Sequence, residues 1–437
     1  MKPFSFNTTI NNADEFQLKL LNWAHTFNVC ALFNSNQYPD YPYAKHDFIL
    51  AVNAIKTLEV NKENPWQQIK KQLKANPNWW YGYLTYDLKN YTEDLSSENT
   101  DIIQFPDYFF FVPKWIFKIK GNEVFIYSDS PIHEEIINEI NLTAINKQKD
   151  EDICLKERMS KTTYLKKLDQ ILEHIRKGDI YEVNFCQEFF ETQKGINPIQ
   201  TYVDLNAISK APFSCFLKID QKYLISSSPE RFLKKEGNKI ISQPIKGTAK
   251  RGSNPLEDQE IKLQLQKSLK DTTENIMIVD LVRNDLSKTS IPGTVKVEEL
   301  NQVYSFEQVH QLISTISSQV DEQTHPIEVI KHAFPMGSMT GAPKVMAMEL
   351  IEQYEESKRG LYSGAVGYFD PKGNFDFNVI IRSIMHDAES QNTSVQVGGA
   401  ITYDSDPEQE YEECLIKISA MKQVLEAQDR KDKKMSL

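Results

Sequence analysis

The sequence predicts an α+β protein with large, mainly antiparallel sheets. Some segments carry apolar residues at helical spacing, such as 164–175, which Gly178 closes. Strand-like segments elsewhere meet at short hairpin turns, at 236–238 and at 370–373. Strands and helices do not alternate regularly along the chain, so a doubly wound parallel sheet is disfavoured.

Proline marks the start of two predicted helices. Asn254 and Pro255 fit the N-cap and first helical residue of a helix that runs to about Lys270. Asp406 and Pro407 open the last helix in the same way. In both helices the capping side chain is of a type that accepts hydrogen bonds from the first helical turn.

The composition is that of a folded globular protein. The chain has 437 residues, of which 40% are hydrophobic and 25% charged. This length allows one large domain or two ordinary ones. The formal net charge of -11 argues against nucleic-acid binding. An anionic substrate would therefore need a locally basic site or a metal ion.

No segment predicts secretion or membrane insertion. The first residues, MKPFSFNTTI, lack a positive region followed by an apolar run. The most apolar stretch, 108–117, is too short to span a bilayer as a helix and contains Pro113 and Lys114. The five cysteines are scattered and form no CxxC pair. We therefore expect a reduced, cytoplasmic protein with no membrane partner.

The chain divides into two regions by composition. Residues 1–145 are rich in aromatic side chains and asparagine, whereas clear helices and hairpins occupy 156–425. The polar stretch 146–157 is predicted to connect them. We expect the second region to be the catalytic one and the charged tail, 429–437, to be frayed.

Two of the predicted helices place acidic side chains on one face. In the last helix, Glu410, Glu413 and Lys417 lie at positions i, i+3 and i+7. In a second helix, Asp271 and Glu274 are three residues apart. Mg²⁺ usually binds one or two carboxylates together with water and substrate oxygens, so two such faces could form a magnesium site. Alternatively, these acids complement the helix dipoles and face water.

A loop with two glycines, GSMTGAPK at 337–344, precedes another predicted helix. Its glycines, serine and threonine surround a backbone that could turn its N–H groups inward to bind an anion. The spacing is not that of a Walker loop. A plain turn is the alternative.

Two further features, at Arg382 and at Gly398 and Gly399, have both a functional and a structural explanation. Arg382 lies in an apolar segment, 379–384, predicted as a strand, where it would bind a carboxylate or form a structural ion pair. Gly398 and Gly399 indicate either a β-bulge or a close approach to the backbone. Tyr362 on its own predicts only a core or surface aromatic residue.

Glu230 and Lys246 are titratable residues predicted to lie in turns. Glu230 follows a strand and a proline, and Lys246 lies in PIKGTAKRG, 244–252. Each alone is most simply a solvated turn residue. A nucleophilic Lys246 would need a pKa lowered from about 10.4, by burial or by nearby cations such as Lys250 and Arg251.

Five long motifs follow one another along the chain: PIKGTAKRG, DTTENIMIVDLVRNDLSK, GSMTGAPKVMAMELIE, RGLYSGAVGYF and DSDPEQEYEECLIK. Together they resemble the chorismate-utilising enzymes, a family that includes anthranilate, aminodeoxychorismate, isochorismate and salicylate synthases. The resemblance runs from near Lys156 to about Leu425 and is loose before it. It implies the chorismate-binding fold, with two facing, mainly antiparallel sheets surrounded by helices and the site between them.

The resemblance also implies a magnesium ion on the ring carboxylate of chorismate. Glu274 and Glu413 would bind Mg²⁺ directly, and Asp271, where the family usually has Glu, would act with Glu410 through water. The implied substrate contacts are Gly247, Thr248 and Lys417 at the ring carboxylate, Ser338, Thr340 and Gly341 along the ring, and Tyr362, Arg382, Gly398 and Gly399 at the enolpyruvyl carboxylate.

The lysine of PIKGT resembles that of the aminodeoxychorismate branch, whereas anthranilate synthases typically carry PIAGT. By this resemblance Lys246 attacks C2 of chorismate and expels the C4 hydroxyl, and ammonia then adds at C4. Glu230 would be the general acid and afterwards the base. Anthranilate synthase component I is the alternative. Its elimination histidine aligns with Gln311, and a one-residue slip would place His310 there.

The resemblance implies that a separate glutamine amidotransferase subunit supplies the ammonia. None of the five cysteines lies in a Gly-x-Cys-x-Gly elbow, and no pyruvate-lyase region is evident. The expected product, 4-amino-4-deoxychorismate, would pass to another enzyme on the way to 4-aminobenzoate and folate.

Overall fold

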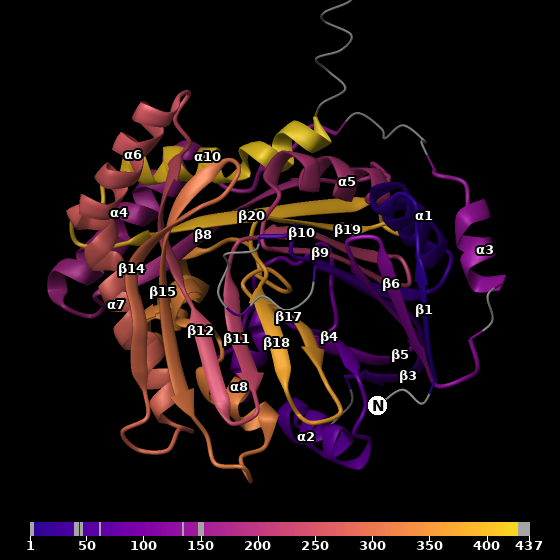
Figure 1. The fold of residues 1–437 in the computed structure, drawn as a ribbon. Helices are drawn as coiled ribbons and strands as arrows, with labels where there is room; N and C mark the ends of the chain where they lie inside the picture. The colour runs from indigo at the N-terminus through magenta and orange to yellow at the C-terminus, as the bar shows by residue number, and fades with distance from the viewer. Residues whose placement is uncertain are drawn as a thin grey trace, which may run out of the picture.

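The computed structural model describes residues 4–38, 43, 47–60, 63–132, 135–146 and 153–426. The tail predicted to be frayed, 429–437, and part of the predicted connector lie outside the described residues. Long antiparallel strands, joined largely by hairpins, are covered by helices (Figure 1). This arrangement confirms the predicted α+β fold class.

The pairings between the strands of this part of the chain are antiparallel. The strands are β1 (Phe4–Thr9), β2 (Val29–Asn34), β3 (Phe48–Glu59), β4 (Trp80–Leu84), β5 (Tyr108–Lys120), β6 (Glu123–Ser128), β7 (Lys156–Glu157), β8 (Glu182–Glu191), β9 (Phe213–Ile219), β10 (Lys222–Ser228), β11 (Arg231–Glu236), β12 (Lys239–Gln243), β13 (Ile245–Lys250), β14 (Lys296–Ser305), β15 (Val309–Gln319), β16 (Gly341–Ala342), β17 (Ala365–Phe369), β18 (Phe375–Val379), β19 (Ser383–Asp387) and β20 (Asn392–Ile401). The helices are α1 (Ala13–His25), α2 (Pro65–Ala75), α3 (Glu135–Leu142), α4 (Lys161–Lys177), α5 (Pro198–Ser209), α6 (Pro255–Lys267), α7 (Leu269–Ser287), α8 (Pro326–Ala333), α9 (Lys344–Tyr354) and α10 (Pro407–Leu425), with 3-10 turns η1 (Tyr86–Tyr91) and η2 (Gly337–Met339).

The strands form two arms that diverge from the paired strands β3 and β5. The first arm runs β3, β2, β9, β10, β19, β20 and β8, with β7 and β16 on β8. The second runs from β5 through β4, β17, β18, β11, β12 and β15, with β13 and β14 also on β15. The candidate site lies where β8 and β16 of the first arm meet β13 of the second.

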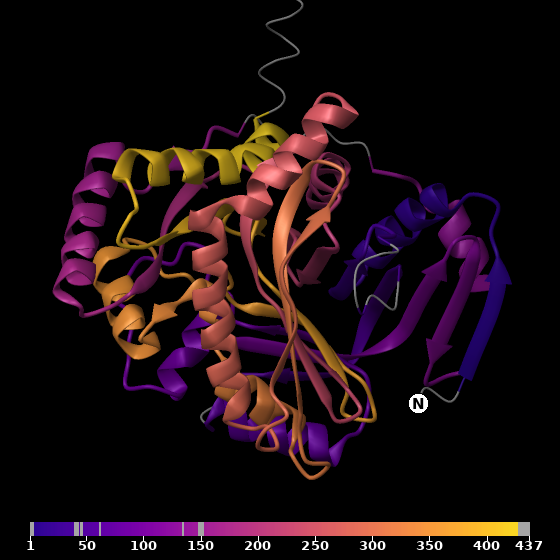
Figure 2. The same ribbon diagram turned by 60° about the vertical axis from the view of Figure 1, so that its left-hand side comes forward.

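The N-terminal strands complete both arms. In the first arm β2 pairs with β9, and in the second β4 pairs with β17. The strand β4, WYGYL, is buried throughout because both of its faces are covered. A Cβ at Gly82 would lie 1.9 Å from the carbonyl oxygen of Phe109, so only glycine fits there. The predicted regions 1–145 and 156–425 therefore share their sheets, although α1 and β1 lie far from α4 and α7 (Figure 2).

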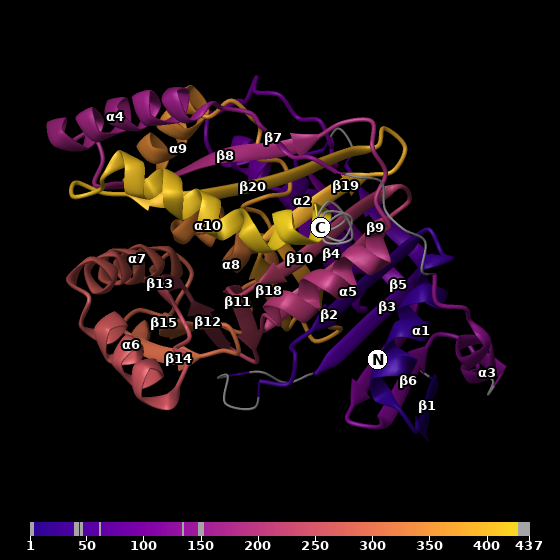
Figure 3. The same ribbon diagram turned by 90° about the horizontal axis from the view of Figure 1, so that it is seen from above.

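The helices cover the outer faces of the arms. Helix α10 packs on β20, and α7 packs on β13 and β15 (Figure 3). The predicted helix starts are confirmed, because Asn254 and Asp406 accept hydrogen bonds from first-turn N–H groups. The helix predicted to reach about Lys270 ends earlier, at Lys267, because Ser268 turns the chain and caps α7.

No helix among the described residues is both long and apolar enough to cross a bilayer.

Candidate active site

Glu230 lies between β10 and β11 and is buried, not solvated as a turn residue would be. Its side chain accepts a 2.6 Å hydrogen bond from Ser338 Oγ. Burial raises the pKa of Glu230 to about 7, although the Ser338 hydrogen bond and the charges of Lys246 and Arg382 act to lower it. A carboxyl group with this pKa can donate a proton at neutral pH and take one back.

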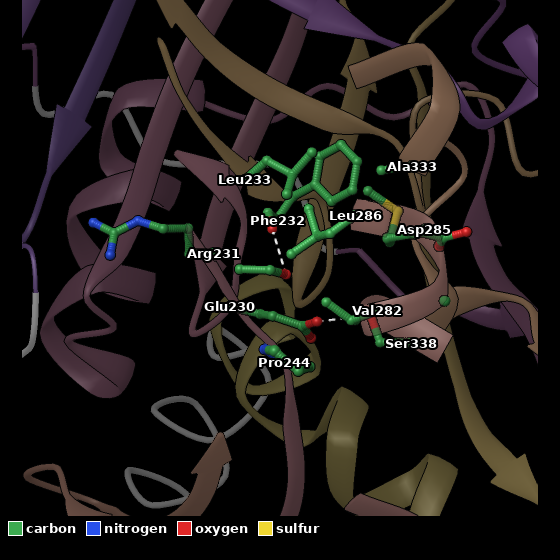
Figure 4. A pocket seen from close by; sticks show the side chains of 13 residues that line it. Glu230, Arg231, Phe232, Leu233, Pro244, Val282, Asp285, Leu286, Ala333 and Ser338 are labelled. Atoms are coloured by element: carbon green, nitrogen blue, oxygen red, sulfur yellow. Dashed lines mark hydrogen bonds between the residues drawn. The ribbon is translucent and has the colours of Figure 1, made fainter. Parts of the chain in front are cut away.

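Glu230 and Ser338 line a pocket of about 310 Å³ that is partly open to solvent (Figure 4). The Glu230 carboxyl group points toward Ser338, whereas the next side chain, Arg231, points away and donates to Asp376 at 2.9 Å. Few polar groups face Glu230 here, which accounts for its poor solvation. The apolar lining includes Phe232, Leu233, Val282, Leu286, Ala333 and Met336.

Lys246 lies in a strand and not in the predicted turn. It belongs to β13, which pairs with β15, and its side chain is only 9% exposed. The Nζ atom is 3.0 Å from Oε1 of Glu182, at the start of β8. This ion pair joins the two arms of the sheet inside the protein.

The surroundings of Lys246 are acidic. Burial alone would lower the pKa of Lys246, but the carboxylates of Glu182, Glu274 and Glu230 outweigh it and raise the pKa above its usual value. The amine is therefore protonated at neutral pH in the ligand-free protein. A nucleophilic role requires that a nearby group remove this proton.

The cations expected beside Lys246 lie elsewhere. Lys250 is exposed at the far end of β13. Arg251 donates from two nitrogen atoms to the Asp258 carboxylate, both at 2.7 Å. Neither of the conditions considered for a lowered pKa, burial or nearby cations such as Lys250 and Arg251, lowers the pKa of Lys246 in the folded protein, because carboxylates outweigh burial and strand β13 carries the two cations away from the buried end.

Gly247 forms a β-bulge in β13. The register with β15 shifts between Lys246 and Thr248, and Gly247 has a φ of +74°. A Cβ at this position would lie 2.9 Å from Oδ1 of Asp271, at the start of α7. A bulge disrupts the ladder locally, so backbone N–H groups here can face the site.

Glu274 on α7 and Glu410 on α10 are not the solvated acids of the alternative interpretation. Each has a buried oxygen with no hydrogen-bond partner among the described residues, Oε1 of Glu274 and Oε2 of Glu410. Burial raises the pKa of Glu274 to about 7, against the opposing charges of Lys246 and Lys270. The Lys270 ammonium donates to the other oxygen of Glu410 at 3.2 Å. Buried carboxylate oxygens without a hydrogen-bond partner, such as Oε1 of Glu274 and Oε2 of Glu410, suit a bound cation.

Glu413 and Lys417 lie one turn further along α10. Their Oε1 and Nζ atoms are 2.7 Å apart, and Lys417 also donates to the carbonyl oxygen of Gly398 at 2.7 Å. Burial would raise the pKa of Glu413, but Lys417 keeps it below its usual value. The negative charge of Glu413 raises the pKa of Glu274 in turn, so the acidic faces of the two helices converge.

The donors fit Mg²⁺, although the described residues contain no group of three acidic, histidine or cysteine side chains already gathered as a metal site. Mg²⁺ commonly takes one or two protein carboxylates and completes its shell with water and substrate oxygens. The unpartnered oxygens of Glu274 and Glu410, on two helices, are suitable hard donors. The ligand set with Asp271 and Glu413 remains a proposal.

The GSMTGAPK loop is built from η2 and β16, and α9 follows it. Ser338 uses its hydroxyl to hold Glu230. Thr340 is fully buried and donates to the carbonyl oxygens of its own turn, so its hydroxyl supports the loop. A Cβ at Gly341 would lie 2.1 Å from the carbonyl oxygen of Glu182, so this glycine allows β16 to pack on β8.

Arg382 lies in the turn between β18 and β19, with a φ of 50°, and not within the predicted strand. The turn brings its charge close enough to Glu230 to lower the pKa of that carboxyl. Tyr362 is buried, and its hydroxyl accepts a 3.7 Å contact from the Cys186 thiol on β8. Arg382 thus lies near Glu230, and Tyr362 lies against β8, the strand that carries Glu182.

Gly398 and Gly399 do not form a bulge. They pair with Cys186 and Phe185 in unbroken register, so that prediction is wrong. The alternative, a close approach to the backbone, is correct: a Cβ at Gly399 would lie 3.1 Å from Oε2 of Glu410. The missing side chain leaves room beside the unpartnered carboxylate oxygen.

His310 and Gln311 point to opposite faces of β15, as neighbours in a strand do. The imidazole of His310 contacts Asp258 at 3.0 Å and Ser305 at 2.8 Å. Gln311 instead reaches toward β13, where its Nε2 donates to Thr248 Oγ1 at 3.4 Å. Gln311 is thus the residue of this pair that faces the site.

Sequence reasoning missed two charged residues of the site. Glu182 pairs with Lys246, and Lys270 pairs with Glu410. The available signal for Glu182 was an acidic residue at the start of a strand that is almost entirely buried, since buried acids usually need a cation. Lys270 directly precedes Asp271 in α7, but the sequence predicted it as the last residue of the preceding helix.

The two facing arms and the convergent acids, lysine and buried glutamate define a class of enzyme that binds chorismate. Residues 30–423 match the family described as chorismate binding enzyme, and the chain belongs to this family.

Among individual relatives, aminodeoxychorismate synthase component 1 of Escherichia coli is 41% identical over 61% of this chain and 58% of its own length. The chain therefore spans less than two thirds of that relative. Anthranilate synthase component 1 of Saccharolobus solfataricus is 34% identical over 78% of this chain and 79% of its own length. Both activities are thus represented among the similar proteins.

Solved structures share the fold. Anthranilate synthase component I from Streptococcus pneumoniae superposes with a TM-score of 0.77, at 24% identity, over 88% of this chain and 94% of its own. The menaquinone-specific isochorismate synthase from Escherichia coli gives a TM-score of 0.75, at 17% identity, over 97% and 94% of the two chains. These likenesses support the prediction of two facing sheets with helices around them.

Proposed function

We propose that this chain aminates chorismate at C4 to form 4-amino-4-deoxychorismate. The observation that carries the proposal is the pair of buried titratable groups, Lys246 and Glu230, whose charges interact within one site. One is an amine able to attack carbon once neutral, and the other is an acid with a pKa of about 7.

In this reaction Lys246 forms a bond to C2 of chorismate while the C4–O bond breaks. Glu230 gives its proton to the departing hydroxyl, which leaves as water. Ammonia then forms the C4–N bond, Glu230 takes the surplus proton, and the C2–N bond to Lys246 breaks. Bound Mg²⁺, held by Glu274 and Glu413 with Asp271 and Glu410, would neutralise the ring carboxylate.

The other substrate contacts follow from charge and position. Lys417 and the N–H groups at the Gly247 bulge would face the ring carboxylate, and Arg382 the enolpyruvyl carboxylate. Chorismate is a dianion. Each of its two carboxylates would then meet positive charge or N–H donors, although the net charge of the chain is -11.

Anthranilate synthesis is the second candidate, because a relative with that name matches most of the chain. That reaction must eliminate pyruvate after amination at C2. The orientation of β15 favours the first candidate, since His310 contacts Asp258 and Ser305 while the neutral amide of Gln311 faces Thr248.

The ammonia source is a partner in this proposal. The name component 1, carried by the relative from Escherichia coli, suggests a second component. We infer a glutamine amidotransferase subunit, and a subsequent lyase that would release 4-aminobenzoate for folate synthesis.

Product analysis tests the proposal. Protein with chorismate, Mg²⁺ and ammonium should yield 4-aminobenzoate only after a lyase is added, and chelation of Mg²⁺ should stop turnover. Lys246→Ala should lower the rate of amination at least about a hundredfold, while the variant still binds chorismate. Direct release of fluorescent anthranilate, or full activity of Lys246→Ala, would contradict it.

A further inference from the structure

Glu182 is a buried carboxylate that the proposed reaction has not yet used. It lies at the start of β8, opposite Ala342 of β16, and is 1% exposed. Its Oε1 accepts a hydrogen bond from Lys246 Nζ at 3.0 Å. Its Oε2 is buried and has no hydrogen-bond partner among the described residues. The carboxylate therefore has a free lone-pair site and one close cation.

We propose that Glu182 is the proton acceptor that converts the Lys246 ammonium into a nucleophilic amine, an inference that rests on the proposed amination. The Nζ–H bond directed at Oε1 breaks and an O–H bond forms on Glu182. The electron pair left on Nζ forms the bond to C2 of chorismate. When the C2–N bond later breaks, Lys246 leaves as the neutral amine and recovers the proton from Glu182.

The contact places the proton donor and the acceptor within hydrogen-bond distance, so this exchange needs no rearrangement. Proton transfer from an ammonium to a carboxylate turns two buried charges into two neutral groups, which removes an unfavourable desolvation. Glu230 cannot serve as the acceptor in the same step, because it must hold a proton for the hydroxyl that leaves C4. The two acids thus have separate tasks at C2 and C4.

The other charges around Lys246 come from several elements. Glu274 on α7 and Glu230 after β10 act with Glu182 to raise its pKa, and Lys246 in turn lowers the pKa of Glu413 on α10. In the part of the chain that the structure describes, Glu182 is the one carboxylate in contact with the amine, at 3.0 Å. This contact distinguishes it from the more distant carboxylates.

The test is Glu182→Gln, which keeps the shape but cannot take the proton. We expect kcat at pH 7 to fall by about a hundredfold or more. We also expect kcat of the variant to rise about tenfold per pH unit below the pKa of Lys246, while that of the wild type stays flatter. Glu188→Gln is the matched control, since Glu188 lies on β8, is buried and pairs with Arg158 at 2.7 Å. The control should keep the wild-type profile.

A second measurement needs no turnover. Competitive labelling with acetic anhydride, followed by mass spectrometry of the Lys246 peptide, gives the titration of the amine in the full chain. In Glu182→Gln the pKa of Lys246 should fall, and in Glu182→Asp it should change less. The inference is overturned if Glu182→Gln keeps the wild-type rate and pH profile, or if labelling of Lys246 is unchanged. Activity of Lys246→Ala would instead overturn the nucleophile itself.

Discussion

At the residue scale, burial gives Glu230 a chemistry that its sequence position did not reveal. A glutamate after Pro229 would ordinarily be solvated, and no pattern of neighbours in the chain indicated otherwise. Its environment comes from Ser338, Lys246 and Arg382, which lie on three other segments. The residue types of the site were predictable from the motifs, whereas the pKa directions depended on contacts made by the fold.

Replacing Glu230 by Gln should make stability less dependent on pH. The folded pKa is raised from 4.5 to about 7, so the folded state binds the proton more tightly and stability falls as pH rises through this window. The free energy of unfolding that the wild type loses in this way, on the order of 3 kcal/mol above pH 7, is not lost by the variant. Urea midpoints at pH 5 and pH 8 measure it.

The exposed Glu139 on α3 provides the control, because Glu139→Gln should change the two midpoints equally. An equal pH dependence of wild type and Glu230→Gln would show that Glu230 titrates normally in the folded protein. Glu230→Gln should also lose amination, since the amide cannot protonate the hydroxyl that leaves C4.

At the element scale, helix starts were predicted better than strand ends. Local capping chemistry placed Asn254 and Asp406 correctly. Lys246 and Arg382 were misplaced, because a bulge and a turn with positive φ depend on strands distant in sequence. The Glu182–Lys246 contact likewise joins β8 and β13, which no local pattern connects.

The acidic faces of α7 and α10 make a prediction about Lys270. Its ammonium lies 3.2 Å from Glu410 and also acts on Glu274 and Glu413, so it would compete with the proposed metal ion for the same negative charge. Lys270→Met should therefore tighten Mg²⁺ binding by about three- to tenfold, a modest factor because the side chain is 48% exposed. Isothermal titration with Mg²⁺ alone measures it.

Lys161→Met is the matched control. Lys161 also pairs with acids of α10, Glu408 at 2.6 Å and Glu412 at 3.8 Å, outside the site. Lys161→Met should leave the affinity for Mg²⁺ unchanged. Weaker binding in Lys270→Met than in wild type would mean that Lys270 supports the site and does not compete with the ion.

At the scale of the whole molecule, the two sheet arms predict a single unfolding transition. The pairings β2–β9 and β4–β17 place N-terminal strands inside both arms. Gly82→Ala would drive a methyl group to 1.9 Å from Phe109 O and should destabilise the entire protein by at least about 2 kcal/mol. Calorimetry should show one peak, shifted as a whole.

Gly195→Ala is the control for that experiment, since a Cβ there meets nothing closer than 3.9 Å. Two separate peaks, with only one moved by Gly82→Ala, would contradict the shared core. Composition indicated a boundary near residue 145, but long-range strand pairing, which composition does not report, joins the two sides.

The pairing of β4 with β17 also bears on how the protein is made. Leu84 pairs with Ala365, so about 280 residues must be synthesised after β4 before its partner exists. At ~5–20 residues per second, translation takes on the order of 15 to 60 s to supply it. During that interval an apolar strand edge stays unpaired, a state prone to aggregation. Yield in a cell should therefore depend on chaperones that shelter nascent chains.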